Sequence, residues 1–449
     1  MALLGVVIAV AITLAGFGSF SATSSNDVRS ASRTTPAPVA APGHRGRGPG
    51  PVPSVTRPLA PSTRAVSHLR VMLARALGAG GPVTGALVYD LSTHQALFVR
   101  RAATGRPPAS VEKLFTTVAL LDKLGPNVSL HTSVLGTGHR VRGVWRGNLY
   151  LRGGGDPTFG DSGFNQVFDH GYGTTANQLV VQLRRRGIHR VTGSVYADES
   201  LFDRRRGGLM TAYAPDVPDF GGQLSALTYD HGTTLKHLSP ALFADRELAL
   251  TMRGSGIAAR AATHERRTPR RARLLALVDS PPVSVLTRLM DVPSDDLFAE
   301  LLTKQLGVLF GTGGTISGGA SVIASTIAST YGLHPTILDG SGLSRHDRSS
   351  PAQIVGLLRA VWHTPLGGQL AASLPTVGVQ GTVQGIGVKT AAKGRCIAKT
   401  GTLDFVTNLA GYCRAQGHHA LAFAIMLDGP LNSTASVLEG RMIGAIARY

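Results

Sequence analysis

Three strand-like segments followed by a helix form the C-terminal end of the chain, and their order constrains the fold more than any other feature. The strands are expected at residues 395–399, 407–414 and 420–427, and the helix at 433–448. The connection between the first two strands is so short that they should pair as an antiparallel hairpin with a turn near Asp404. The end of the chain therefore predicts an antiparallel sheet.

The start of the globular sequence is expected to add strands to the same sheet. An amphipathic helix is expected at residues 66–77, and strand-like runs follow at 84–90 and 96–99. Another strand is expected at residues 335–338, and the glycine-rich loop after it, residues 339–344, is expected to line a cleft. The simplest architecture is a sheet with helices on both faces, whose strands come from both ends of the chain. We therefore expect an α/β (α+β) fold built on an antiparallel sheet.

An apolar segment and a proline-rich segment precede this globular region. Residues 1–22 predict a signal peptide or a short membrane anchor, and residues 23–63 predict a semi-extended linker rich in Pro and Ala. The apolar run lacks a preceding Lys or Arg and has an imperfect cleavage site, so both alternatives remain open. Either one predicts export to the cell envelope, as a secreted protein or one held at the membrane by its N-terminal segment.

The chain is strongly basic, with a formal net charge of +19 from 45 Lys and Arg against 26 Asp and Glu. Much of the charge lies in arginine clusters at residues 184–186, 204–206 and 266–273. Such a surface can attract polyanions, but the sequence has no recognition-helix motif and no basic strand studded with aromatic residues. We therefore expect solvated loops suited to an anionic envelope and no nucleic-acid partner.

A proline-led helix start at residues 107–121 carries the first candidate catalytic pair. Ser110 and Lys113 are three residues apart, so they lie on one face at the beginning of the helix. A serine hydroxyl is a poor nucleophile until a base removes its proton, and this spacing places an amine beside it. The pair predicts a nucleophile and its base.

Five further motifs follow this helix start in order. The six segments are residues 108–117, 151–158, 280–282, 293–297, 339–345 and 399–402. Together they resemble the penicillin-binding protein 4-type D-alanyl-D-alanine carboxypeptidases and endopeptidases, from about residue 65 to the end of the chain. The resemblance implies a β-lactamase/transpeptidase-like domain that acts on peptidoglycan stem peptides and is acylated by β-lactams, without a metal or cofactor.

The resemblance also implies a role for each motif. Ser110 corresponds to the acylated nucleophile, Lys113 to its general base, and Ser294 to the hydroxyl that relays a proton to the leaving D-alanine. The carboxylate of the substrate or β-lactam is expected on one strand, at Lys399, Thr400, Gly401 and Thr402. The backbone N–H groups of Ser110 and Thr402 are expected to form the oxyanion hole.

One residue departs from the family pattern. The second motif is Ser294-Asp295-Asp296, where the family has asparagine at the third position. An amide can donate a hydrogen bond to the substrate carbonyl, whereas a carboxylate only accepts. Asp296 should pair with Lys113, favour its ammonium form and weaken it as a base. We therefore expect reduced or altered activity, and the alternative is an inactive protein that binds peptidoglycan or an envelope partner.

The spacing of the motifs predicts the domain organisation. The stretch between Lys113 and Ser294 is shorter than in the best-known family members, which carry two nested insertions, and much longer than in class A β-lactamases. We expect a catalytic domain formed by residues 64–135 and 278–449, with one inserted domain at residues 136–277. A β-lactamase is not favoured.

The two cysteines, Cys396 and Cys413, flank the predicted C-terminal hairpin. A cross-strand disulfide is expected in an exported protein, and two free buried thiols are the alternative. The neighbouring His418-His419 pair falls short of a full set of metal ligands, and a solvated turn is the better interpretation.

Overall fold

A computed structural model describes residues 62–207, 222–232, 238–416 and 418–449. The predicted signal or anchor segment, residues 1–22, lies outside the described residues, as does nearly all of the predicted linker. Among the helices of the described ranges, none is both long and apolar enough to cross a membrane.

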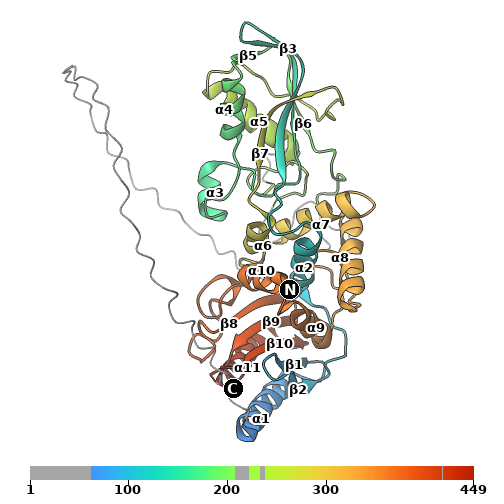
Figure 1. Ribbon diagram of the computed structural model, residues 1–449, viewed down its shortest axis with the longest axis vertical. Coiled ribbons are helices and arrows are strands. Elements are labelled where there is room, and N and C mark those ends of the chain that lie inside the picture. The colour runs from blue at the N-terminus through green and yellow to red at the C-terminus, as the bar shows by residue number, and fades with distance from the viewer. Residues whose placement is uncertain (1–61, 208–221, 233–237, 417) are drawn as a thin grey trace, which may run out of the picture. The chain divides into compact units, whose positions relative to one another are not determined.

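A five-stranded sheet with the order β2-β1-β10-β9-β8 organises the globular part. Its strands are β1 (Gly85–Asp90), β2 (Gln95–Arg100), β8 (Cys396–Leu403), β9 (Val406–Arg414) and β10 (Ala420–Asp428). Every neighbouring pair is antiparallel. Strands from both ends of the chain therefore meet in one sheet, as the sequence predicts, and in Figure 1 the blue and red strands lie side by side.

Two helices from opposite ends of the chain cover one face of this sheet. Helix α1 (Thr63–Ala79) and helix α11 (Asn432–Arg448) pack on each other. Their apolar residues, including Leu73 of α1 and Ile443 of α11, form a buried cluster with strand side chains on this face, such as Phe423 of β10. Burial of each such side chain contributes roughly 1.5–3 kcal/mol, so this face joins the two ends of the fold.

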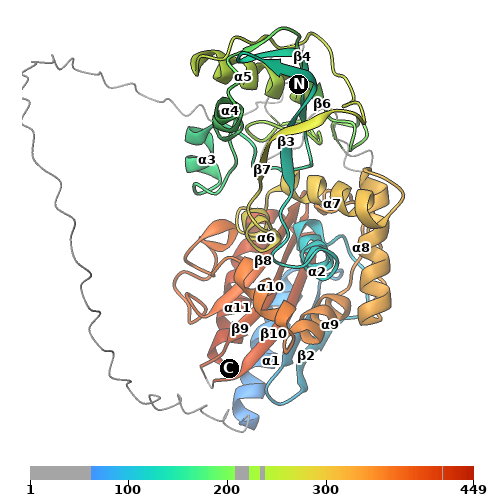
Figure 2. The ribbon, with the colours of Figure 1, turned by 45° about the horizontal axis from the view of Figure 1, so that its top comes forward.

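On the other face of the sheet, the side chains of β9 and β10 join a second buried cluster formed by six helices. They are α2 (Lys113–Lys123), α6 (Val283–Asp291), α7 (Asp296–Phe310), α8 (Ile316–Tyr331), α9 (Pro351–Val361) and α10 (Pro365–Ser373). Helix α2 is buried along residues 113–121 because α6, α7, α8 and α10 surround it (Figure 2). The first catalytic motif is therefore held in the middle of the core.

A second sheet, with the order β5-β4-β3-β7 and β6 beside β4, lies between α2 and α6 in the sequence. Its strands are β3 (His131–Val141), β4 (Val144–Arg152), β5 (Arg190–Val191), β6 (Val195–Asp198) and β7 (Arg273–Asp279). Helices α3 (Ser162–Phe168), α4 (Ala176–Arg185) and α5 (Pro240–Gly254) belong to the same region, which has its own buried cluster. We propose that this region is the inserted domain, expected at residues 136–277; β3 and β7 extend a few residues beyond those limits.

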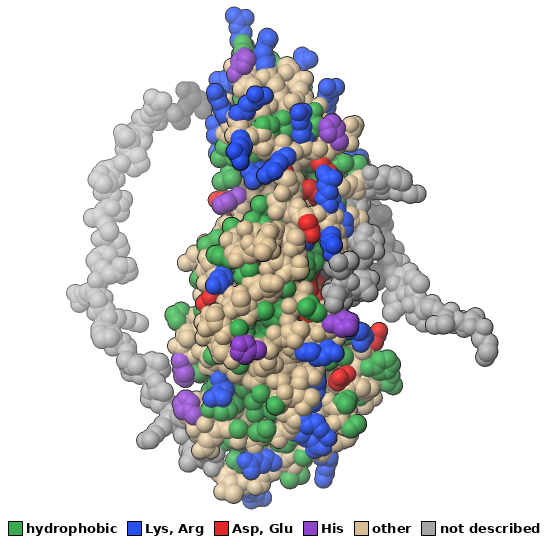
Figure 3. All heavy atoms as spheres, turned by 90° about the vertical axis from the view of Figure 1, so that its right-hand side faces the viewer, with side chains coloured by type: hydrophobic (Ala, Val, Ile, Leu, Met, Phe, Trp, Pro, Cys, Tyr) green, Lys and Arg blue, Asp and Glu red, His purple; other side chains and the backbone are tan. Residues whose placement is uncertain are grey.

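Exposed arginines gather on this second region. Figure 3 shows Lys and Arg side chains over the end of the molecule formed by the β3–β7 sheet. The exposed arginines include Arg140, Arg142, Arg146, Arg184, Arg185, Arg190, Arg270 and Arg271. The basic charge is thus carried in large part by strand ends and loops of this region.

One predicted strand is absent. Residues 335–338 were expected to be extended, but they form only an isolated bridge between Thr336 and Arg348. The cause is the loop that follows. In this loop, aspartate side chains accept hydrogen bonds from backbone N–H groups that a neighbouring strand would otherwise bind. Asp347 accepts from the N–H of Leu338, and Asp339 accepts from the N–H groups of Gly342 and Ser344.

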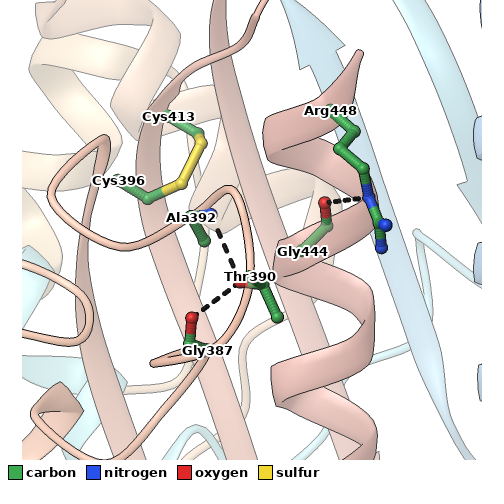
Figure 4. The surroundings of a disulfide bond; sticks show 7 residues. All are labelled: Gly387, Thr390, Ala392, Cys396, Cys413, Gly444 and Arg448. Carbon is green, nitrogen blue, oxygen red and sulfur yellow. Dashed lines mark hydrogen bonds between the residues drawn. A yellow bond between two sulfur atoms is a disulfide. The ribbon is translucent and has the colours of Figure 1, made fainter.

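A disulfide joins Cys396 to Cys413 across the β8–β9 pair (Figure 4). Both cysteines are buried in the cluster beneath α1 and α11. Of the two interpretations of the cysteine pair, the disulfide is the one found.

Removal of this disulfide should destabilise the fold without touching the catalytic motifs. The double variant Cys396→Ala, Cys413→Ala is expected to lose about 3 kcal/mol of unfolding free energy, because the bond restricts the unfolded chain across a separation of 17 residues. Urea unfolding of both proteins measures the difference. Equal midpoints and slopes would contradict the prediction.

Stability should also fall as the pH rises from about 5 to 8. Burial raises the pKa of Asp245 in α5 to about 8, whereas an unfolded aspartate titrates near 4. The folded state therefore binds more protons across this interval, and each pH unit lowers the free energy of unfolding. Urea unfolding at pH 5 and pH 8 should show the decrease, and Asp245→Asn should make it smaller by at least about 1 kcal/mol. An unchanged decrease in the variant would refute the assignment to Asp245.

Candidate active site

Ser110 lies on a short 3-10 turn rather than inside the first turn of an α-helix. The turn η1 spans Ala109–Glu112, and α2 begins only at Lys113. Ala109 has a φ of 49°, a value that non-glycine residues rarely adopt. The α-helix therefore begins later than predicted, at Lys113, although Ser110 and Lys113 still face each other.

Strand β8 packs directly against this turn, which explains the glycine in the Lys-Thr-Gly motif. A Cβ atom at Gly401 would collide with the carbonyl oxygen of Pro108. From the neighbouring strand β9, the amide of Asn408 donates to the carbonyls of Pro107 and Pro108, at 2.9 Å each. Ser110 and the strand that carries the Lys-Thr-Gly motif are thus held at a fixed separation.

Lys113 is fully buried and its amine contacts three acceptors. It lies 3.1 Å from Ser110 Oγ, 2.5 Å from Asp296 Oδ1 and 2.8 Å from the carbonyl oxygen of Ser341. An ammonium has three protons to donate, so these acceptors match the charged form. The pairing of Asp296 with Lys113 expected from the sequence is present in the structure.

Ser294 stands at a sharp turn between α6 and α7. Its φ is 68°, and the next residue, Asp295, caps α7 by accepting from the N–H of Phe298. This turn directs Ser294 Oγ to Lys399 Nζ, at 2.7 Å. The Ser294-Asp295-Asp296 motif and the Lys399–Thr402 motif are therefore joined by a direct hydrogen bond.

Lys399 is the second fully buried lysine of the site. It donates to Ser294 Oγ and, at 3.0 Å, to the carbonyl oxygen of Thr400. Burial, assisted by the charge of Lys113, lowers the pKa of Lys399 to about 7, although Asp291 and Asp296 oppose the shift. An anionic ligand beside Lys399 would favour its charged form.

These groups line one open cleft with a volume of about 420 Å³. Its walls include Ser110, Ser294, Asp296, Thr400 and Thr402. The structure thus brings the sequence-predicted residues together at one site, Lys113 and Lys399 being buried behind its surface.

Two features of the cleft escaped sequence analysis. Thr382 lines the cleft, and its hydroxyl lies 2.7 Å from that of Thr400. Glu439, on α11, lines the far end, and burial raises its pKa to about 8. Neither residue belongs to a recognisable motif, so no sequence signal could have assigned them.

Buried carboxyl groups support the loop that contacts Lys113. Glu300 accepts from the N–H groups of Gly340 and Ser341, and burial raises its pKa to about 8. Burial likewise raises the pKa of Glu112, and the nearby charge of Asp339 adds to the shift. This support places the Ser341 carbonyl at the amine of Lys113. The sequence signal for it was the Asp339–Ser344 loop, which we expected only to line the cleft.

Comparison with known proteins identifies the family. Residues 69–240 and 219–447 match the model of the D-Ala-D-Ala carboxypeptidase 3 (S13) family. The chain belongs to this family. The family resemblance predicted from the sequence motifs is thereby confirmed. The expected serine-type D-alanyl-D-alanine carboxypeptidase activity is confirmed as well, and the alternative of a protein that only binds peptidoglycan is not favoured.

Individual relatives agree with the family match. The D-alanyl-D-alanine carboxypeptidase of Actinomadura sp. (strain R39) is 26% identical over 458 residues, which cover 82% of this chain and 82% of the relative. Carboxypeptidase DacB of Mycolicibacterium smegmatis is 29% identical over 379 residues, covering 79% and 78% of the two chains.

A solved structure confirms the fold. Penicillin-binding protein 4 of Haemophilus influenzae superposes with a TM-score of 0.71 at 20% identity, covering 84% of this chain and 99% of the other. The expected antiparallel sheet flanked by helices is therefore correct.

Replacement of the unusual carboxylate should speed acylation. In Asp296→Asn an amide faces Lys113, so the amine is no longer held as an ammonium and can accept the proton of Ser110. We expect the rate of labelling by a fluorescent penicillin to rise about tenfold or more. Asp279→Asn, which changes an exposed carboxylate on β7, is the matched control. A rate for Asp296→Asn at or below that of the unaltered protein would refute the argument.

Proposed function

We propose that Ser110 is the nucleophile of this carboxypeptidase and that the substrates are peptidoglycan stem peptides ending in D-alanyl-D-alanine. The observation that carries the assignment is the 3.1 Å contact between Ser110 Oγ and Lys113 Nζ in a cleft that also contains Ser294 and the Lys399 strand. A hydroxyl beside an amine, with a second hydroxyl–lysine pair across the cleft, suits acyl transfer.

The reaction proceeds in two steps through an ester. Ser110 Oγ attacks the carbonyl carbon of the penultimate D-alanine and loses its proton, while two backbone N–H groups, those of Ser110 and Thr402, stabilise the oxyanion. The bond from that carbon to the leaving nitrogen breaks as Ser294 delivers its proton to the nitrogen and takes in its place the proton that Lys113 removed from Ser110. Water then attacks the ester, and Lys113 transfers a proton from this water to Ser110 Oγ, which releases the shortened peptide and restores the Ser110 hydroxyl.

Lys113 accepts the Ser110 proton only after it transfers one of its own to Asp296. The 2.5 Å contact between Lys113 Nζ and Asp296 Oδ1 provides a short path for that transfer. The neutral pair of amine and carboxylic acid is then the competent form. Because forming this pair costs free energy, the activity is lower than with an amide at position 296.

Lys399, Thr400 and Thr402 hold the terminal carboxylate of the substrate. Lys399 lacks a carboxylate partner within hydrogen-bond distance among the described residues, and an arriving anion supplies one. The carboxylate of a β-lactam occupies the same place, which makes β-lactams covalent inhibitors. Penicillin-binding protein 4 of Haemophilus influenzae has been solved in complex with a β-lactam.

The same chemistry cleaves cross-linked peptides when the leaving residue belongs to a second stem peptide. Endopeptidase activity is therefore a second candidate. It is supported by a cavity lined by Pro293 and Asp295, the neighbours of Ser294, which leaves room for a leaving residue larger than alanine. Peptidoglycan lies outside the cytoplasmic membrane, so this substrate implies an extracytoplasmic location. Membrane attachment through residues 1–22 is part of the proposal if that segment is retained.

Loss of the Ser110 hydroxyl should abolish acylation and turnover. Ser110→Ala is expected to show no labelling by a fluorescent penicillin and at least a thousandfold lower release of D-alanine from a D-alanyl-D-alanine peptide, because no ester can form. Ser321→Ala, which removes an exposed hydroxyl on α8, should match the unaltered protein.

Two outcomes of this experiment are informative against the proposal. Labelling that persists in Ser110→Ala would place the nucleophile elsewhere. Labelling of Ser110 without release of D-alanine would indicate a protein that is acylated and binds peptidoglycan but does not turn it over.

A further inference from the structure

A second cavity lies next to the catalytic cleft, between the inserted region and helix α6. Its volume is about 570 Å³. The residues on which the inference depends are Phe168, Asp169 and His231 from the inserted region and Leu289, Pro293 and Gly381 from the catalytic region. The mechanism above does not use this cavity.

The cavity adjoins the cleft at the side where the leaving group is expected. Pro293 lines both spaces, and its neighbour Ser294 is the proposed proton donor to the leaving nitrogen. Gly381 lines the cavity, whereas the next residue, Thr382, lines the cleft and contacts Thr400. The two spaces therefore share an edge formed by Pro293 and the turn at Gly381 and Thr382.

The orientation of the substrate directs one substituent toward this edge. The Cα atom of the leaving residue carries a nitrogen, a carboxylate and a side chain. With the nitrogen at Ser294 and the carboxylate at Thr400 and Thr402, the side chain is the group that extends beyond the cleft. The space beyond Pro293 and Gly381 is the cavity.

The inner wall of the cavity holds an acidic group that lacks a full set of partners. Asp169 is 1% exposed, and its Oδ2 atom has no hydrogen-bond partner among the described residues. The other oxygen, Oδ1, lies 3.5 Å from His231 Nε2, which is 3.9 Å from Asp295 Oδ2. Because an unpaired buried carboxylate oxygen is costly, a ligand that donates a hydrogen bond there would bind favourably.

The remaining wall is mostly apolar, although His170, Arg288, Asp295 and Gln380 also line the cavity, and its rim is open. Leu289 is buried, whereas Phe168 and Tyr172 at the mouth are 54% and 56% exposed. Arg288, also at the rim, donates to the carbonyl oxygen of Ala372 at 2.7 Å. An aliphatic chain therefore meets apolar side chains first and the carboxylate of Asp169 at the inner wall.

We propose that this cavity binds the side chain of the leaving D-residue and selects an aliphatic chain that ends in a primary amine. The methylene groups pack against Leu289 and Phe168, and the ammonium donates to Asp169 Oδ2. This inference rests on the proposed function, since it takes the place of the leaving group from Ser294. A leaving D-residue has a free side-chain amine when it is joined to the peptide through its α-amine, so the cavity suits release of a C-terminal basic D-amino acid.

Four peptides that differ only in the C-terminal residue test the proposal. Each ends in D-alanine followed by D-alanine, D-norleucine, D-lysine or D-glutamate, and the release of the last residue gives kcat/KM. We expect D-lysine to be released about tenfold faster than D-norleucine, and D-norleucine at least as fast as D-alanine. Equal values for all four peptides, or a preference for D-glutamate, would overturn the assignment.

Substitutions in the cavity separate charge recognition from packing. Asp169→Asn should abolish the preference for D-lysine over D-norleucine and leave release of D-alanine within about twofold. Tyr172→Ala, at the exposed rim, should lower release of both long residues to the level of D-alanine. The matched control is Asp279→Asn, an exposed carboxylate on β7. A D-lysine preference that survives Asp169→Asn would rule out Asp169 as the recognising group.

Penicillin labelling distinguishes a failure of this inference from a failure of the proposed function. Each variant should label at Ser110 as the unaltered protein does, which shows that its cleft has folded. If the unaltered protein releases D-alanine but shows no preference among the four residues, only the cavity assignment fails. If it labels but releases none of them, the proposed function fails and the inference with it.

Discussion

The contact between Lys113 and Asp296 is the interaction on which the catalytic centre depends. It joins residues 183 positions apart in the sequence, and the Ser341 carbonyl reaches the same amine across 228 positions. One buried ammonium therefore holds together the start of α2, the start of α7 and the Asp339–Ser344 loop. Removing the Lys113 amine would leave a buried carboxylate without compensation, a cost of several kcal/mol. The contact between Lys113 and Asp296 thus stabilises the site and also holds Lys113 in the ammonium form, which weakens it as a base.

The charge of Lys113 affects the pKa of Lys399, the second buried lysine of the site. Lys113 and Lys399 lie in one core, and burial together with the charge of Lys113 brings the pKa of Lys399 down to about 7. Charge on Lys113 is compensated by Asp296, whereas among the described residues the amine of Lys399 donates only to a hydroxyl and a carbonyl oxygen. Because Asp296 pairs with Lys113, an anionic ligand can pair with Lys399. Both lysines keep their positions because strand β8 and turn η1 are in direct contact at Gly401.

Local pattern predicted most of the fold and part of the site. The apolar runs of β9 and β10 and the periodicity of α1 and α11 are short-range features, so their bounds were close to those expected. The same holds for Ser110 and Lys113, which are one turn apart. The strand expected at residues 335–338 failed because Asp339 and Asp347 satisfy the backbone through distant side-chain contacts that no local pattern reports.

The sequence by itself indicated the chemistry of the site: one serine–lysine pair, a carboxylate in place of an amide, and a strand proposed to receive the substrate. Each is a matter of residue type and short spacing, which propensity and periodicity express directly. Only the tertiary structure decided that Asp296 reaches Lys113, that Ser294 reaches Lys399, and that a cavity lined by Asp169 and His231 adjoins Ser294. These contacts depend on how helices and loops far apart in the chain pack on one another, and that packing is a property of the whole core.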